Sequence, residues 1–165
     1  MHQFSVSMQP RVVRDREAAD YYSRAGKMLA SLRAIAAMFR RPPSFAVRIV
    51  ADEHEEEGRY SLVVVANNLY GDSHMPYPDT LEAGVLGIGR APVLPPSANL
   101  KLIADLAAGD WRGNEDYDMH PARAVTLHFP RLKHTAHATL DGELVPLKQT
   151  VELKIQPGAL RVLKP

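Results

Sequence analysis

The chain has 165 residues, of which 45% are hydrophobic and 24% are charged, a composition typical of a soluble globular domain with a substantial core. Its formal net charge of +1 gives no overall attraction to nucleic acid or to an anionic membrane, so either partner would need a local patch. The sequence contains no cysteine, which excludes disulfides, a thiol nucleophile and cysteine-ligated zinc. Together with the lack of a signal peptide, this favours a cytoplasmic protein.

The chain is predicted to begin with an arm and a helix. Residues 1–12 show no sustained period and are interpreted as part of an entering arm, residues 1–20, that precedes a single domain at residues 21–165. Within residues 15–41, apolar side chains recur at helical spacing, namely Met28, Leu32, Ile35 and Phe39. Two consecutive prolines, Pro42 and Pro43, end this predicted leading helix.

After the prolines the period changes to that of strands. Residues 44–52 alternate Phe45, Val47 and Ile49 with other side chains, and residues 59–68 form a second apolar run. The acidic run between them, residues 52–58, is expected to be the solvated tip of a hairpin. A loop rich in proline and glycine is predicted next, followed by a strand, at residues 69–84 and 85–94 respectively.

The remaining residues predict one short helix and more strands. The helix is expected at residues 97–111 and a polar loop at residues 113–121. Strands are then predicted at residues 123–129, 134–140, 150–156 and 159–165. In one of them, Val151, Leu153 and Ile155 share a face opposite Glu152 and Lys154. One leading helix, many short strands and a possible second helix predict a mainly β fold, an antiparallel β-sandwich or barrel.

Several common catalytic signatures are absent from the sequence. There is no phosphate loop, no GxGxxG opening a helix, no GxSxG and no HExxH. The glycines of "GVLGIGRA" lie inside a strand pattern, so they are interpreted as packing or bulge glycines. The seven histidines are scattered, and the sequence gives no geometric reason for them to converge. No metal site is predicted.

Two polar stretches are candidates for a functional site. In "LDGELV", Asp141 and Gly142 form the pair preferred in a two-residue hairpin, and Glu143 follows at once, so two carboxylates flank one glycine. In "ANNLYGD", Asn67 and Asn68 end an apolar strand, a position where binding residues are common. Both stretches are also ordinary turn formers, and the residues alone leave the two interpretations open.

Taken in order, four segments resemble the C-terminal half of the bacterial diacylglycerol kinase-like lipid kinases, a family that includes the sphingosine kinases. These segments are "VVVANNLYG", "LEAGVLGI", "LDGELV" and "VELKIQPGALRVLKP". The resemblance covers about residues 20–165, and its closing stretch is the most specific part. It implies a β-sandwich domain that follows an α/β nucleotide-binding domain with a Gly-Gly-Asp-Gly-Thr motif. That motif does not occur in this sequence, so the second domain alone is expected here.

The resemblance also implies a reaction and the residues for it. The family transfers the γ-phosphoryl group of ATP to a lipid hydroxyl in the cleft between its two domains, and this domain would form the acceptor side. ATP and Mg²⁺ are expected for the full-length enzyme and neither for this domain alone. Glu143 would be the catalytic base, with Asp141 orienting it or shaping the turn. Substrate contacts would fall on Asn67, Asn68 and Tyr70.

The implied partners are the lipid substrate, the nucleotide-binding domain in the same or a separate chain, and a transient membrane surface. A homodimer stays open, and no nucleic acid is expected. One departure from the family concerns a structural magnesium site, because a double acidic pair is here Glu82-Ala83-Gly84. Hard cations prefer carboxylate oxygens, so backbone carbonyls at residues 80–85 would bind an ion only weakly. The alternative function is a non-catalytic β-sandwich module that binds a lipid or a partner protein, with the Asp-Gly-Glu turn only a turn.

Overall fold

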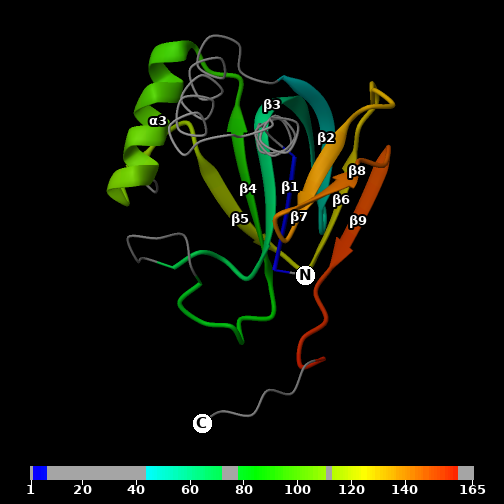
Figure 1. Ribbon diagram of the computed structural model, residues 1–165. Coiled ribbons are helices and arrows are strands. Elements are labelled where there is room, and N and C mark those ends of the chain that lie inside the picture. Colours follow the sequence, from blue (N-terminus) through cyan, green and yellow to red (C-terminus); the bar gives the residue numbers. More distant parts are fainter. Residues whose placement is uncertain (1, 7–43, 72–77, 111–112, 160–165) are drawn as a thin grey trace, which may run out of the picture.

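The computed structural model describes residues 2–6, 44–71, 78–110 and 113–159 (Figure 1). The helix predicted over residues 15–41 lies outside the described residues, and so does almost all of the strand predicted at residues 159–165. Within the described ranges the chain forms nine strands and one helix. No helix in these ranges is both long enough and apolar enough to cross a bilayer.

The elements confirm the predicted mainly β fold. Helix α3 (Pro96–Ala108) is the predicted short helix. The strands are β1 (Gln3–Val6), β2 (Phe45–Ala51), β3 (His54–Asn67), β4 (Leu86–Pro92), β5 (Asp118–Ala122), β6 (Ala124–His128), β7 (His137–Leu140), β8 (Glu143–Pro146) and β9 (Thr150–Lys154).

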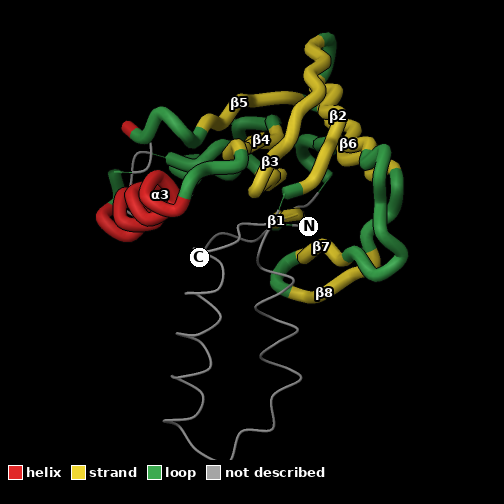
Figure 2. Tube along the Cα trace, turned by 90° about the horizontal axis from the view of Figure 1, so that it is seen from above, coloured by secondary structure: helices red, strands yellow, loops and turns green. Residues whose placement is uncertain are grey.

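All strand pairs are antiparallel, and hydrogen bonds join the strands into one nine-stranded sheet. Its main path runs β8-β7-β1-β3-β2-β6-β9, while β4 pairs with β3 and β5. Strand β3 is long enough to pair with β2 along its first half and with β1 along its second half. On one side of β3 the path continues through β1, β7 and β8, and on the other side through β2, β6 and β9. These two branches curl toward each other, so that β7 and β8 lie across from β2 and β6 (Figure 2).

The curled sheet encloses the main core. The alternation predicted in residues 44–52 is confirmed, because Val47 and Ile49 are buried there. The main core also includes Phe4, Val6, Val63, Val65, Ile88, Val125, Leu127 and Phe129. A second cluster lies between the outer face of β3 and β4 and helix α3, and consists of Ala66, Tyr70, Ala91, Leu94, Leu102 and Tyr117. The predicted face of β9 packs against the main core, whereas Glu152 and Lys154 are exposed.

The glycines of β4 are packing glycines, as predicted. A Cβ atom at Gly89 would lie 2.2 Å from the hydroxyl oxygen of Tyr117 and 2.9 Å from a methyl group of Val64. A Cβ atom at Gly87 would lie 2.8 Å from the carbonyl oxygen of Asn68. Neither position has room for a side chain, because backbone atoms of Asn68 and Leu69 lie against Gly87, and the side chains of Tyr117 and Val64 lie against Gly89.

Strand β3 contains a β-bulge in its middle. The pairing with β4 shifts register between Tyr60 and Leu62, so Ser61 is an extra residue on β3. The Ser61 hydroxyl donates a hydrogen bond of 2.7 Å to the carbonyl of Pro92. Because side chains alternate along a strand, the extra residue reverses which side chains face the core on either side of it.

Two predictions for loops are wrong, and the predicted entering arm contains a strand. The acidic run is not a solvated loop: only Asp52 and Glu53 form the turn, and β3 already begins at His54, opposite Ala51. The polar stretch at residues 113–121 contains most of β5, an edge strand that exposes Asp118, His120 and Pro121 and shows no apolar period. The supposed arm contains β1, which lies inside the sheet but is too short to show a period.

Both two-residue turns of the sheet begin with an aspartate whose φ is positive. The φ angles are 51° at Asp141 and 90° at Gly142, which is the hairpin turn predicted for this pair. The Asp141 carboxylate accepts hydrogen bonds of 2.7 Å from the backbone N–H groups of His2 and of Gln3. Its own N–H donates to the carbonyl of Gln3 at 2.8 Å. The turn therefore holds the first residues of β1.

Asp52, whose φ is 50°, makes the same contacts at the other turn. Its carboxylate accepts from the N–H groups of Arg123 at 3.0 Å and Ala124 at 2.9 Å, and its N–H donates to the carbonyl of Ala124. These backbone hydrogen bonds, from Arg123 first, lower the pKa of Asp52. Those from Gln3 and His2 likewise lower the pKa of Asp141. In both places an ionised aspartate fixes the start of a neighbouring strand.

We expect Asp141→Asn to lower the melting temperature at pH 7 by roughly 2–4 °C, which corresponds to about 1 kcal/mol in a chain of this size. Asparagine suits the turn equally well, so the loss comes from the charge that strengthens two hydrogen bonds. The pKa of Asp141 is lower in the folded chain than in the unfolded chain, where it is about 3.9. The stabilisation is therefore complete above about pH 4 and is lost as the pH falls through the folded-state pKa.

The measurement is thermal unfolding of both proteins between pH 7 and pH 2. The difference between them should shrink below about pH 4, because protonated aspartate resembles asparagine. Glu152→Gln removes an exposed carboxylate from β9 and should leave the melting temperature unchanged. A difference that stays constant down to pH 2 would show that the charge of Asp141 is not what holds β1.

Candidate functional site

Most of the predicted site residues gather around the first residues of β1. Asn67, the last residue of β3, donates its backbone N–H to the carbonyl of His2 at 2.8 Å. The Tyr70 hydroxyl donates to the side-chain carbonyl oxygen of Gln3 at 3.3 Å. Asp141 holds the N–H groups of both His2 and Gln3. We call this group, His2, Gln3, Asn67, Tyr70 and Asp141, the β1 junction.

The pairing of β1 sets the spacing within the junction. Gln3 lies opposite Ala66 on β3, and Phe4 lies opposite Leu140 on β7. The ends of β3 and β7 therefore flank β1 on its two sides, with Asn67 and Asp141 two strand spacings apart. At about 4.8 Å per spacing, this separation is roughly 10 Å.

The two carboxylates of the Asp-Gly-Glu turn have different surroundings. Asp141 is occupied by the N–H groups of β1, in the same arrangement as Asp52, which lies at no candidate site. Glu143 is the first residue of β8 and is exposed, and no hydrogen bond or ion pair joins its carboxylate to another described residue. Both N–H groups bind the same Asp141 oxygen, Oδ1, whereas neither oxygen of Glu143 has a partner among the described residues.

Asn68 is a buried residue with an unusual backbone. Its φ is 77° and its side chain is 2% exposed. Its N–H donates to the carbonyl of Val85 at 3.0 Å, and its side-chain amide nitrogen reaches the carbonyl of Leu81 at 3.4 Å. Asn68 therefore fastens the loop at residues 78–85 to the end of β3. Among the buried side-chain polar atoms of the described ranges, its Oδ1 is the one without a hydrogen-bond partner.

Tyr70 is buried as well, with its ring in the cluster beneath α3. Burial raises the pKa of its hydroxyl, so Tyr70 is neutral at physiological pH and acts as a hydrogen-bond donor to Gln3. Asn67 differs from Asn68 and Tyr70 because it is only partly buried. Its side chain is thus the most accessible of the three predicted substrate contacts.

The loop at residues 78–85 does not form a carboxylate site for a metal ion. Glu82 is exposed, and its N–H donates to the hydroxyl of Thr80 at 3.2 Å. No group of three or more histidine, aspartate or glutamate side chains within the described ranges is placed to hold a metal ion. A Mg²⁺ ion here would depend on carbonyl oxygens and Asn68 Oδ1, a donor set that does not fit the carboxylates this ion prefers.

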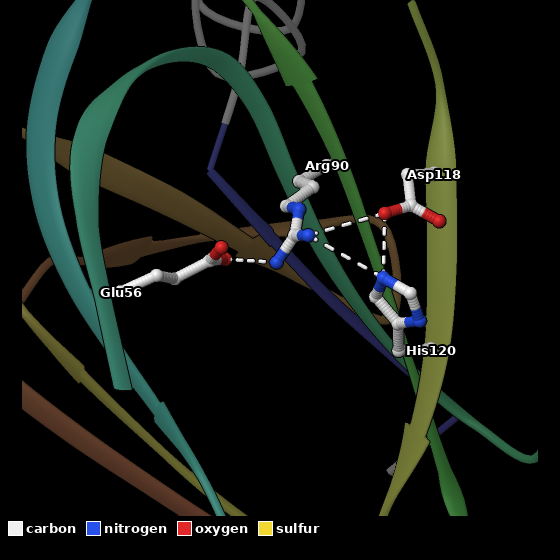
Figure 3. Close-up of polar contacts among 4 residues, drawn as sticks. All are labelled: Glu56, Arg90, Asp118 and His120. Atoms are coloured by element: carbon white, nitrogen blue, oxygen red, sulfur yellow. Dashed lines mark hydrogen bonds and ion pairs between the residues drawn. The ribbon is translucent and has the colours of Figure 1, made fainter. Parts of the chain in front are cut away.

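The structure also contains a polar cluster that the sequence did not predict (Figure 3). Arg90 of β4 forms ion pairs with Glu56 of β3 and with Asp118 of β5, the latter at 3.1 Å. His120 Nε2 lies 2.5 Å from the same Asp118 oxygen. The β4–β5 pairing places Asp118 directly opposite Arg90, and this pairing was missed because β5 was not predicted. Glu56 lies seven residues before Val63, the β3 residue that pairs with Arg90. The histidines are also less scattered than predicted, because His54 and His120 line one pocket.

The sequence matches no protein-family model and no curated protein. Three solved structures from Bacillus anthracis str. Sterne, each described as a diacylglycerol kinase, do match the fold. The first is 18% identical with a TM-score of 0.55, covering 93% of this chain and 49% of that one. The second is 17% identical with a TM-score of 0.57, covering 94% and 49%. The third is 16% identical with a TM-score of 0.54, covering 93% and 50%.

The likeness extends over nearly the whole of this chain but only about half the length of those structures. At identities of 16–18%, it concerns the arrangement of the backbone. It agrees with the resemblance carried by the four sequence segments, which point to the same proteins. The chain therefore has the fold that bacterial diacylglycerol kinases have over about half of their length.

Proposed function

We propose that this chain is the C-terminal, lipid-acceptor domain of an ATP-dependent lipid kinase that phosphorylates a diacylglycerol-like hydroxyl. The observation that carries the proposal is the match of 93–94% of the chain to structures described as diacylglycerol kinases. The sequence segments that resemble this family support it independently. The nucleotide-binding domain would be supplied in the same chain or by a separate one, and the reaction would occur in the cleft between the two.

Glu143 is the proposed general base. Its carboxylate accepts the proton of the lipid hydroxyl while the hydroxyl oxygen attacks the γ-phosphorus of ATP, and the bond to the β-phosphate oxygen breaks to release ADP. Two features support this role: the carboxylate is exposed, and it has no partner among the described residues. The antiparallel pairing of Glu143 with Leu140 fixes its backbone, so the side chain projects from a rigid hairpin. Mg²⁺, held with ATP, would neutralise charge on the phosphates.

The other predicted residues are assigned supporting roles. Asp141 is a positioning residue, because its carboxylate already holds β1 beside the turn. Asn67 is the proposed direct contact to the lipid head, since its side chain is the accessible one. Asn68 and Tyr70 are buried, and they would shape the acceptor side of the cleft by fixing the end of β3 and the loop at residues 78–85.

The lipid would be taken from a membrane surface by a cytoplasmic enzyme that binds there transiently. Leu81 supports this, because its apolar side chain is 76% exposed on the loop that Asn68 fastens. One exposed side chain on this loop offers only a small apolar surface to a bilayer. The contact with the membrane is therefore proposed to be peripheral and brief, and a homodimer is compatible with it.

Residues 1–165 alone should show no kinase activity. Phosphoryl transfer depends mainly on holding ATP and its metal ions in place, and the proposal assigns those groups to the other domain. The measurement is transfer of labelled γ-phosphate to a panel of lipids, first with this chain alone and then with the chain joined to its nucleotide-binding domain. Lipid binding without transfer in the joined protein would favour a non-catalytic lipid-binding module instead.

In the joined protein, Glu143→Gln should reduce kcat by roughly two to four orders of magnitude, the usual contribution of a general base. Glutamine keeps the shape of the side chain but cannot take the proton. Asp141→Asn is the matched control on the same turn and should change kcat by less than tenfold. Melting temperatures measured beside the rates separate loss of the base from loss of the fold. Near-normal turnover in Glu143→Gln would place the base elsewhere.

A further inference from the structure

A pocket lies between the first residues of β3 and residues of β2, β4 and β5. It has a volume of about 380 Å³, near the lower end of the usual range for small-molecule sites. Its apolar walls include Ile49 of β2 and Ile88 of β4, which are 2% and 3% exposed and belong to the main core. The pocket therefore reaches the hydrophobic interior of the curled sheet, where an alkyl chain can be buried.

Charged side chains line the open part of this pocket. Glu56 and Arg90 contribute to its lining, and Asp118 lies behind Arg90 on the neighbouring strand (Figure 3). Arg90 uses Nη1 for Glu56 and Nη2 for Asp118. Because both amino groups are already paired with carboxylates, Arg90 is poorly placed to bind an added anion.

The charges around the pocket do not cancel. Glu55, which also lines it, pairs with Arg48 at 2.7 Å on the outer side of the hairpin. Three carboxylates, two guanidinium groups and two histidines thus lie in or beside the pocket, so the carboxylates outnumber the guanidinium groups by one. The carboxylates are those of Glu55, Glu56 and Asp118, the guanidinium groups those of Arg48 and Arg90, and the histidines His54 and His120.

The position of the pocket separates it from the proposed catalytic turn. No residue of the β1 junction and neither carboxylate of the Asp-Gly-Glu turn is among the residues that line the pocket. A ligand in the pocket would therefore not be the acceptor beside Glu143. The site is independent of the kinase proposal, and its test does not need phosphoryl transfer.

We propose that this pocket binds a small single-chain amphiphile with a cationic head, such as a primary alkylamine. The alkyl chain lies against Ile49 and Ile88 at the floor of the pocket, and the ammonium group lies beside Glu56 at its rim, where the carboxylates outnumber the guanidinium groups. A carboxylate head of the same size would meet these carboxylates and find Arg90 already paired. The charge at the rim thus determines which head group is preferred, whereas the apolar walls bind the alkyl chain of either amphiphile equally well.

The test compares n-octylamine, n-octanol and octanoate by isothermal titration calorimetry with residues 1–165 at pH 7.5. The three probes share one alkyl chain and differ only in the charge of the head. We expect octylamine to bind most tightly and octanoate least tightly, with roughly a tenfold difference in Kd, the scale of one partly buried ion pair. Raising the salt concentration should narrow the difference.

Glu56→Gln and Asp118→Asn should each reduce the preference for octylamine over octanoate by roughly three- to tenfold while leaving octanol binding unchanged. Glu57→Gln is the matched control: it removes a carboxylate from the next residue of β3, whose exposed side chain is not part of the pocket lining. Asp118→Asn lies on an edge strand, so it provides a folded variant if Glu56→Gln is unstable. Equal binding of the three probes, a preference for octanoate, no binding at all, or an unchanged preference in both variants would each overturn the proposal.

Discussion

The two hydrogen bonds from the backbone of His2 and Gln3 to the carboxylate of Asp141 are the contact on which one branch of the sheet depends. They fix the start of β1, and β1 is the strand through which β7 and β8 pair with the rest of the described sheet. The hairpin that carries Glu143 is therefore positioned by a strand from the opposite end of the chain. Stability of this branch and placement of the candidate base depend on the same contact, so a substitution at Asp141 affects both.

The same contact changes how an acidic motif should be interpreted. In the sequence, the two carboxylates of Asp-Gly-Glu are equivalent candidates, and the family resemblance assigns both to the site. In the structure, Asp141 repeats the arrangement of Asp52, where a positive φ and an adjoining strand account for the aspartate without any substrate. The backbone hydrogen bonds to Oδ1 lower the pKa of Asp141, which makes its carboxylate a weaker proton acceptor. The Glu143 carboxylate accepts no such hydrogen bond from a described residue, because β1 passes on the Asp141 side of the turn.

Features set by local sequence were predictable, and those set by distant pairing were not. Alternation identified β2 and β9, and the Asp-Gly pair identified the turn between β7 and β8, because these signals need only a few neighbouring residues. Strand β1 has four residues and β5 is a polar edge strand, so neither shows a period. The cluster around Arg90 joins three strands: the β4–β5 register places Asp118 opposite Arg90, and the path of β3 brings Glu56 to the same arginine. For the same reason, the sequence could not tell which carboxylate of the turn is free.

The extra residue in the middle of β3 determines which side chains of this strand face the interior. With Ser61 inserted, Glu56 and Val63 face the same interior although seven positions separate them, an odd number that would put them on opposite faces of a regular strand. The second half of β3 thereby contributes Val63 and Val65 to the core, whereas its first half contributes Glu56 to the charged rim of the pocket. Loss of that single residue would rotate the first half of the strand, turning Glu55 and Glu57 inward and Glu56 out to water. The polarity of the cavity is thus encoded by the length of the strand as much as by the identity of the side chains on it.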